Sequence, residues 1–475
     1  MISDFFKSFK LRSYSLYIMF GVATVLLFLK GMSSFITSSE FWSIFLSQHL
    51  LPFQDVWPSV FMKPIFHSVL ALIHLLEFSD TNHIYFAKLL FTLNGIAQFF
   101  LVYFLLNQLF KKSSFLNLLL TAFLFLSPLI LTHFDRIRSD QLALTVMLFY
   151  LYFIYSRPSV QFRYHFAFLM IFPLIGFKHI YFSILVLFFI PLKSTFDYFK
   201  TLSFFKRFII ILLFANALVW GIFLGIPSLS YFLAILRSDL NFRGPLVWLK
   251  TEWFFIYLSL IPFFIAPFRK YLKNKGLSIL WKIQCVSLLI IVIHPQKFPF
   301  FIASFLPLIY LNGLFFIHYL KDTQLIPRRI FITTVVGMSF YNLYLAQKHY
   351  RILTTNQQQF ETISALSKII TENNLTYLDG MGVLPTGKNV GCFVSPEDDL
   401  SNQACLQFIK AGTADAIIVT NRLMTLGFDF STLGKYQYHA AGPNLFIHER
   451  IKKDLAIENT NWAPPILIFS SEQLN

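Results

Sequence analysis

The chain has 475 residues, of which 56% are hydrophobic and only 13% are charged, and 61 of them are phenylalanine. This composition indicates a polytopic membrane protein and excludes an ordinary water-soluble enzyme. The formal net charge of +16 does not indicate a nucleic-acid partner. Most of the basic residues lie in short loops between apolar stretches, which is the positive-inside pattern of membrane proteins.

Apolar runs long enough to cross about 30 Å of hydrocarbon occur throughout the first three quarters of the chain. The run 163–192 is interrupted at Gly176-Phe177-Lys178-His179, which predicts two short or tilted helices. The run 64–78 is too short to cross comfortably and predicts an interfacial or re-entrant helix. Counting the two helices of 163–192 and leaving out 64–78, the sequence predicts about eleven spans. The other predicted spans are 13–35, 83–109, 114–133, 139–156, 206–226, 246–268, 277–293, 298–319 and 328–346.

The basic residues predict the orientation of these spans. No small-residue cleavage site follows the first apolar run, so we expect the first helix to remain as an anchor. If 64–78 does not cross, all the basic loop clusters fall on the side of the N-terminus, which is then cytoplasmic. We therefore expect a multi-pass protein of the bacterial inner membrane with an extracytoplasmic C-terminal region. The clusters are Lys111/Lys112, Arg157/Arg163, Lys193/Lys200/Lys206/Arg207, Arg269/Lys270/Lys273/Lys275 and Lys321/Arg328/Arg329.

The sequence changes character from about residue 350. Apolar strands such as Ala416-Ile417-Ile418-Val419 alternate with helical patterns such as 356–370, which predicts a small α/β domain. We expect a transmembrane domain over 1–348, with a first outer loop at 36–82, and an extracytoplasmic α/β domain over 349–475. The predicted fold class is thus mainly α, a membrane bundle with a small α/β C-terminal domain.

Two of the three cysteines lie in this C-terminal region. Cys392 and Cys405 could form a disulfide there, because disulfides persist in extracytoplasmic compartments. Cys285 lies in an apolar run and is expected in the core. No cysteine spacing resembles a zinc site, and no P-loop, dinucleotide fingerprint or serine elbow occurs in the C-terminal domain.

With this topology the titratable residues of the transmembrane domain converge on the outer face. Charged groups held close to a bilayer cost free energy, so their default interpretation is a functional site. The first outer loop contributes two carboxylates and a lysine, and later loops contribute further cations. The candidates are Glu40, Asp55, Lys63, Arg136, Arg138, Lys178, His294 and Lys297.

Short motifs at these positions follow one another in a characteristic order. They are Ser39-Glu40-Phe41-Trp42, Asp55-Val56-Trp57-Pro58, Lys63-Pro64-Ile65-Phe66, Gln108-Leu109-Phe110-Lys111-Lys112, Leu126-Ser127-Pro128 with Asp135-Arg136-Ile137-Arg138-Ser139-Asp140, Gly176-Phe177-Lys178, and His294-Pro295-Gln296-Lys297-Phe298. In this order they resemble the GT-C superfamily of polyprenyl-phosphate-sugar-dependent glycosyltransferases, which includes protein O-mannosyltransferases and the lipid A aminoarabinose transferases. The resemblance covers roughly residues 10–320. It departs from the family at Ser39, where the family has its leading catalytic Asp.

The resemblance implies transfer of a sugar, a mannose-like hexose or a related one, from a polyprenyl-phosphate donor to a lipid, glycan or protein acceptor on the outer face. Such transfer needs a base for the acceptor hydroxyl and cations for the leaving phosphate. Because Ser39 replaces the leading acid, either Glu40 or Asp55 is expected to be the catalytic base. Lys63, Arg136, Arg138, Lys178, His294 and Lys297 are expected to bind the donor phosphate.

The expected partners are a polyprenyl-phosphate-linked sugar, membrane lipids and an unidentified acceptor. No cofactor is predicted, and the scattered acids of the membrane domain do not indicate a metal site, although a divalent metal would suit the chemistry. A polysaccharide polymerase or ligase and a membrane transporter or flippase are the alternatives. Transporters are expected to show internal repeats and polar residues at mid-membrane depth, and neither is evident in this sequence.

Overall fold

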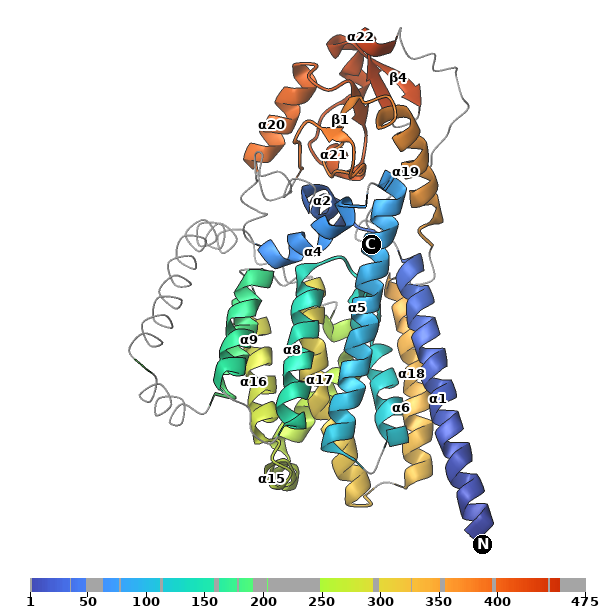
Figure 1. Cartoon of the computed structure of the whole chain (residues 1–475), viewed down its shortest axis with the longest axis vertical. Helices are drawn as coiled ribbons and strands as arrows, with labels where there is room; N and C mark the ends of the chain where they lie inside the picture. Colours follow the sequence, from blue (N-terminus) through green and yellow to red (C-terminus); the bar gives the residue numbers. More distant parts are fainter. Residues whose placement is uncertain are drawn as a thin grey trace.

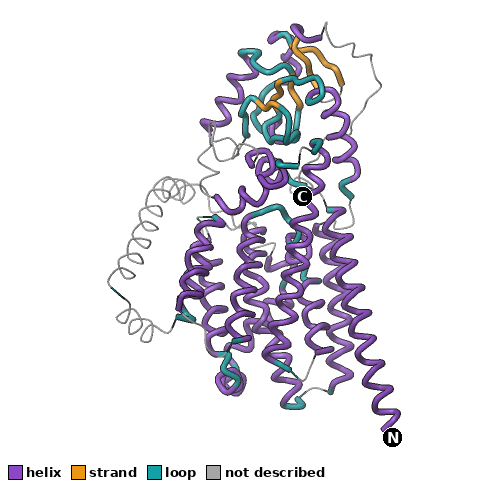
Figure 2. The backbone as a smooth tube through the Cα atoms, in the orientation of Figure 1, coloured by secondary structure: helices purple, strands orange, loops and turns teal. Residues whose placement is uncertain are grey.

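The structure is a computed structural model that describes residues 2–34, 36–47, 63–76, 78–111, 114–157, 162–176, 179–190, 203, 248–293, 299–325, 327–350, 355–394, 399–442 and 445–452. A long helical bundle carries a small α/β domain at one end (Figure 1). The N-terminal end of α1 (Ile2–Ser33) lies at the opposite end of the bundle. Among the described residues the strands are confined to the C-terminal domain (Figure 2).

The bundle is built around two long apolar helices. α5 (Asp80–Leu109) packs against α1, α6 and α8, and α17 (Pro299–Asp322) packs against α7, α14 and α16. These two are the described helices that are long and apolar enough to cross a membrane, and the bent pair Trp253–Phe264 and Ala266–Asn274 would make a third. The remaining helices are α6 (Ser114–Phe125), α7 (Pro128–His133), α8 (Ser139–Ser156), α9 (Phe162–Ile175), α10 (Ile180–Leu187), α14 (Trp253–Leu260), η3 (Ile261–Phe264), α15 (Ala266–Asn274), α16 (Ser278–Ile293) and α18 (Arg328–Tyr350).

Several predicted spans have a different form in the structure. The run 114–133 is divided into α6 and α7, because Pro128 cannot donate a backbone hydrogen bond and begins a new helix. The run 246–268 is bent, and α15 turns by 85° from the preceding helix. The predicted interruption near Gly176 is confirmed, since α9 ends at Ile175 and α10 begins at Ile180.

Two short helices lie between the bundle and the C-terminal domain (Figure 1). α2 (Ser38–Ser47) and α4 (Pro64–His74) pack against each other and against α5. With 11 residues and a rise of about 1.5 Å per residue, α4 is about half as long as a membrane crossing requires. It lies across the end of the bundle, in agreement with the prediction of an interfacial helix.

The C-terminal domain contains a five-stranded sheet in the order β2-β1-β3-β5-β4. The strands β2, β1 and β3 are parallel, whereas β5 is antiparallel to both β3 and β4. The small α/β domain predicted from the sequence is therefore present. Its elements are β1 (Thr376–Leu378), β2 (Lys388–Asn389), β3 (Ala416–Ile418), β4 (Tyr438–Gly442), β5 (Leu445–His448), α19 (Gln357–Ile370), α20 (Asp399–Lys410), α21 (Asn421–Met424), η4 (Phe430–Tyr436) and α22 (Glu449–Lys452).

A disulfide joins Cys392 to Cys405, with their Cα atoms 5.1 Å apart. The bond connects the segment after β2 to α20, and both cysteines are buried in a cluster with Val394, Ile409 and Leu423. This is the pairing that the two C-terminal cysteines suggested. Cys285 is a free thiol on α16.

The C-terminal domain and the outer end of the bundle share one hydrophobic core. Phe41 and Ile44 of α2 and Phe66 of α4 belong to the same buried cluster as Ile363 and Met381 of the C-terminal domain. A second contact is aromatic, because the Trp42 ring stacks on Phe393 with the centroids 4.6 Å apart. The domain is therefore packed onto the first outer loop.

A buried carboxylate reinforces this packing. Asp80, the first residue of α5, accepts hydrogen bonds from Thr386 N at 2.6 Å and Thr386 Oγ1 at 2.8 Å. Its other oxygen accepts from Ser367 Oγ at 2.8 Å and Thr371 Oγ1 at 2.7 Å. All three partners belong to the C-terminal domain, so Asp80 holds that domain on the bundle.

Candidate active site at the outer end of the bundle

Glu40 occupies the first turn of α2 and is fully buried. Thr37 stands three residues before it, and Glu40 Oε2 accepts hydrogen bonds from Thr37 N and Thr37 Oγ1, both at 2.7 Å. This is one half of a capping box, in which the acid at the third helical position accepts from the backbone N–H of the capping residue. The Thr37 hydroxyl donates to the same carboxylate. Glu40 therefore fixes the start of α2.

The same carboxylate also connects α2 to the segment between α7 and α8. Glu40 Oε1 accepts from Ile137 N at 2.7 Å, and Oε2 lies 3.2 Å from Arg136 Nη1. Burial alone would raise the pKa of Glu40, but the nearby Arg136 and Lys88 and the hydrogen bonds from Thr37 outweigh it and lower that pKa. Glu40 is thus an ionised carboxylate whose two oxygens accept four hydrogen bonds.

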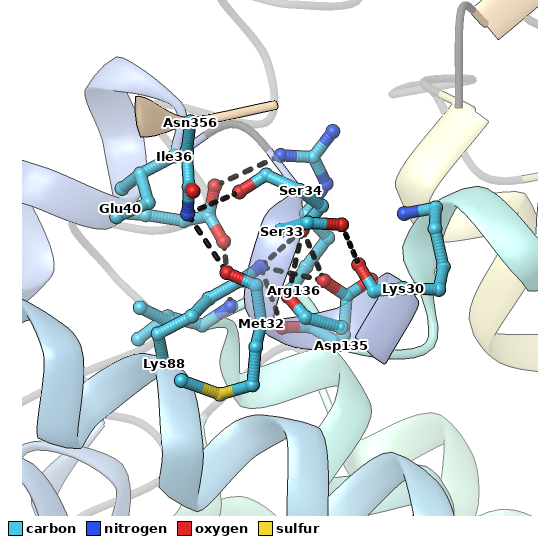
Figure 3. A network of polar contacts seen from close by, with 12 residues as sticks. Lys30, Met32, Ser33, Ser34, Ile36, Glu40, Lys88, Asp135, Arg136 and Asn356 are labelled. Carbon is cyan, nitrogen blue, oxygen red and sulfur yellow. Dashed lines mark hydrogen bonds and ion pairs between the residues drawn. The ribbon is translucent and has the colours of Figure 1, made fainter. Parts of the chain in front are cut away.

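A second ion pair lies beside the first (Figure 3). Lys88 Nζ of α5 is 2.5 Å from Asp135 Oδ2, and both side chains are fully buried. Ser34 at the end of α1 donates to the same carboxylate oxygen. Burial alone would raise the pKa of Asp135, but Lys88, Lys30 and Arg136 hold it well below its usual range.

Two glycines allow these groups to meet. A side chain at Gly31 would clash with the Thr92 side chain, so the glycine brings the end of α1 against α5. A Cβ at Gly95 would lie 2.6 Å from Phe134 O, so this glycine brings α5 against the segment that carries Asp135. Residues 34, 88 and 135 are far apart in the sequence, and their contact depends on these close approaches.

Glu252, the residue before α14, holds the start of α7. It is fully buried and accepts from Leu129 N at 2.6 Å and Ser127 Oγ at 2.8 Å. Tyr310 Oη donates to it at 3.2 Å. Because Leu129 is in the first turn of α7, Glu252 anchors the short helix that leads into Asp135 and Arg136.

The structure brings some of the cations predicted to bind the donor phosphate to the same end of the bundle. Arg138 Nε lies 3.3 Å from Asp140 Oδ2, and His179 Nδ1 lies 3.9 Å from Asp140 Oδ1. Lys63 is at the start of α4, and a Cβ at Gly176 would touch both the Lys63 and the His179 side chains. Lys63, Arg136 and Arg138 therefore all lie at the outer end of the bundle.

Other predicted residues fall outside the described residues, namely Asp55, Lys178, His294 and Lys297. In the described ranges there is no group of three or more His, Cys, Asp or Glu side chains that could hold a metal ion. The sequence interpretation overlooked Lys30, Ser34, Lys88 and Glu252. Lys30 and Lys88 carried a usable signal, because a charged residue inside an apolar run is a functional candidate by default.

The fold and the site together describe an apolar helical bundle whose buried charges collect beneath the C-terminal α/β domain. No protein-family model matches the sequence, and no curated protein matches it. Among solved structures, the chain is similar to ArnT from Cupriavidus metallidurans bound to undecaprenyl phosphate, with a TM-score of 0.51 and 12% sequence identity. The match covers 95% of this chain and 99% of that chain.

The apo state of the same protein matches with a TM-score of 0.47, 12% identity, and coverage of 88% of this chain and 95% of that chain. The match to the undecaprenyl-phosphate-bound structure shows that the chain has the fold of ArnT over nearly its whole length. ArnT is a lipid A aminoarabinose transferase with the GT-C fold. The fold implied by the sequence resemblance is thus confirmed.

Proposed function

We propose that the protein is an integral-membrane glycosyltransferase that uses a polyprenyl-phosphate-linked sugar. The main support is that the first outer loop, through Glu40, is joined to Arg136 and Ile137 at the outer end of an ArnT-like bundle. The similar ArnT structure contains undecaprenyl phosphate, a polyprenyl phosphate. A mannose-like hexose or a related sugar, and a lipid, glycan or protein acceptor, remain part of this proposal.

We assign different tasks to the two acids of the first outer loop. Glu40 accepts four hydrogen bonds and pairs with Arg136, and a carboxylate with lowered pKa and occupied lone pairs is a weak base. In this proposal Glu40 positions Arg136, while Asp55 deprotonates the acceptor hydroxyl. The cations Lys63, Arg136, Arg138, Lys178, His294 and Lys297 stabilise the leaving phosphate.

The test is turnover of a panel of polyprenyl-phosphate sugars by the purified full-length protein. Asp55→Asn should lower the rate by about 10²–10⁴-fold, the usual contribution of a positioned base. Glu40→Gln should weaken donor binding, and its effect should overlap with that of Arg136→Met rather than add to it. Asp429→Asn is the matched control, because Asp429 is an exposed acid of the C-terminal domain. Wild-type rates in both Asp55→Asn and Glu40→Gln would rule out a first-loop site.

We propose the orientation that the basic loops predict, with the N-terminus cytoplasmic and the C-terminal domain extracytoplasmic. In support, α15 with its exposed Arg269, Lys270 and Lys273 lies at the end of the bundle opposite the C-terminal domain (Figure 1). Reporter fusions should read cytoplasmic at Lys273 and external after Arg351. The opposite readout at Lys273 would reverse the orientation.

A further inference from the structure

Three polar groups of the candidate active site have no hydrogen-bond partner among the residues that the structure describes. Lys30 lies in the last turn of α1 beside the buried network (Figure 3), and its ammonium group makes no hydrogen bond or ion pair with any described residue. Both ring nitrogens of His133 are buried, and in the described part of the chain neither has a hydrogen-bond partner. The same holds for Asp135 Oδ1.

These three groups belong together. The charge of Lys30 interacts most strongly with Asp135 and then with Lys88, Arg136 and Glu40. The charges that act on His133 are, in decreasing order, those of Arg136, Arg138, Asp135 and Lys30. Buried polar groups in native proteins nearly always have a partner, and each exception calls for an explanation. Three such groups within one electrostatic neighbourhood point to a polar ligand that binds among them.

The charges of the network indicate the charge of that ligand. Glu40 is neutralised by Arg136, and Asp135 is neutralised by Lys88. Lys30 is the remaining cation of this five-membered group, so the group has a surplus of one positive charge. A ligand group with one negative charge would balance it, and the phosphate of a lipid-linked sugar, being a diester, carries one such charge.

The surroundings of Lys30 favour a lipid as the carrier of this phosphate. On the same helix, Val25, Leu26 and Leu29 are 56%, 60% and 58% exposed, so an apolar surface of α1 ends beside Lys30 in the sequence. An acyl or prenyl chain can lie on that surface, whereas a soluble phosphate gains nothing from it.

We propose that Lys30 and His133 form a binding site for the phosphodiester of a lipid-linked sugar, with Asp135 Oδ1 accepting a hydrogen bond from a sugar hydroxyl. Lys30 donates to one non-bridging phosphate oxygen, and a ring N–H of His133 donates to the other. The inference rests on the proposed function and adds two donor-binding residues to it. Neither residue was among the candidates that the sequence motifs indicated.

The test compares Lys30→Met with Lys348→Met in the full-length protein in nanodiscs. Lys348 is the matched control because it is an exposed lysine in the last turn of α18, whereas Lys30 faces the network. The probes are undecaprenyl phosphate, its methyl ester as a diester, and uncharged undecaprenol, with inorganic phosphate as a soluble competitor. Lys30→Met should weaken both phosphate lipids by about tenfold to a hundredfold, as for a lost charge-assisted hydrogen bond, and leave undecaprenol unchanged. Lys348→Met should change nothing.

Two further variants separate a binding role from a structural one. Lys30→Arg keeps the charge and should retain most of the affinity, and His133→Phe keeps the ring shape and should weaken the diester. If Lys30→Met unfolds, His133→Phe and Lys30→Arg still decide the question through the same probes. Wild-type affinity for the diester in both Lys30→Met and His133→Phe overturns the inference and leaves the proposed function intact. If inorganic phosphate competes at equal concentration, the lipid-phosphate site is wrong. If the unmodified protein binds no phosphate lipid, both this site and the proposed function are wrong.

Discussion

At the end of the bundle that carries the C-terminal domain, Lys88, Asp135 and Glu40 are fully buried and ion-paired. At the opposite end, the cations of α15 are exposed, and Lys275 lies 3.9 Å from a partly exposed Asp322. Exposed charges cost little and serve to orient the chain in the membrane. Buried charges near a bilayer are costly to desolvate, so their concentration at one end is the reason for placing the candidate active site there.

The largest loss of stability is expected when one partner of the buried Lys88–Asp135 pair is removed. Lys88→Met leaves Asp135 buried with Ser34 as its remaining close partner, and the loss of one partner of a buried ion pair costs about 3–5 kcal/mol. Thermal unfolding in detergent should show a large decrease in Tm. The double variant Lys88→Met/Asp135→Leu should recover part of that loss, because neither member of the pair is then left as a buried charge without its partner. If the single variant unfolds like the wild type, the pair is not a buried ion pair in the native protein.

A smaller effect is expected where the C-terminal domain is attached. Asp80→Ala removes the acceptor for Thr386, Ser367 and Thr371, and hydrogen bonds to a charged group contribute about 1.5–3 kcal/mol. Hydrogen exchange or limited proteolysis should show faster opening of α19 and of the segment around Thr386. Glu361→Ala, a change at an exposed acid of the same helix, is the control and should leave exchange as in the wild type.

Acid should lower the stability that Glu40 and Asp135 contribute to the folded protein. The pKa values of Glu40 and Asp135 are lowered on folding from ordinary values of 4.5 and 3.8. Their stabilising contribution is therefore complete above about pH 5 and is lost as the pH falls through the ordinary values toward the folded ones. Unfolding midpoints measured from pH 7 to pH 3 should decrease, and Glu40→Gln should flatten that decrease. Parallel curves for the two proteins would show that Glu40 does not contribute.

The smallest effect is expected at the opposite end. Lys273→Met removes an exposed charge, and exposed substitutions usually change stability by less than about 0.5 kcal/mol. The unfolding midpoint should stay within error of the wild type. If Lys273→Met lowers the unfolding midpoint as much as Lys88→Met does, the charges at the two ends do not differ in their contribution to stability.

Much of this organisation could be predicted from local sequence features. The break at Gly176, the short length of α4, the α/β domain and the pairing of Cys392 with Cys405 are all as predicted from the sequence. The overall hydrophobicity of the run 114–133 predicts one span, whereas Pro128 within it begins a new helix. The run length of an apolar segment says little about bends of this kind.

The candidate active site was only partly predictable. Glu40 was identified as important, but its capping contact with Thr37 was also legible in the sequence and was not used. The partnership of Lys88 with Asp135 depends on the close approaches at Gly31 and Gly95, which no local pattern specifies. Single charges inside apolar runs could have marked Lys30 and Lys88, but not their partners.

The contacts between α19 and the first outer loop have a consequence for the biogenesis of the protein. Asn356 donates to Met32 O and Ser34 O, and Gln359 both donates to Ile36 O and accepts from Ile36 N. The turn that leads from α1 to Glu40 is thus held by residues that leave the ribosome more than three hundred positions later. A nascent or truncated chain that ends before α19 lacks these hydrogen bonds, so the turn before Glu40 takes its final form only after α19 has been synthesised. Formation of this part of the candidate site therefore coincides with completion of the chain.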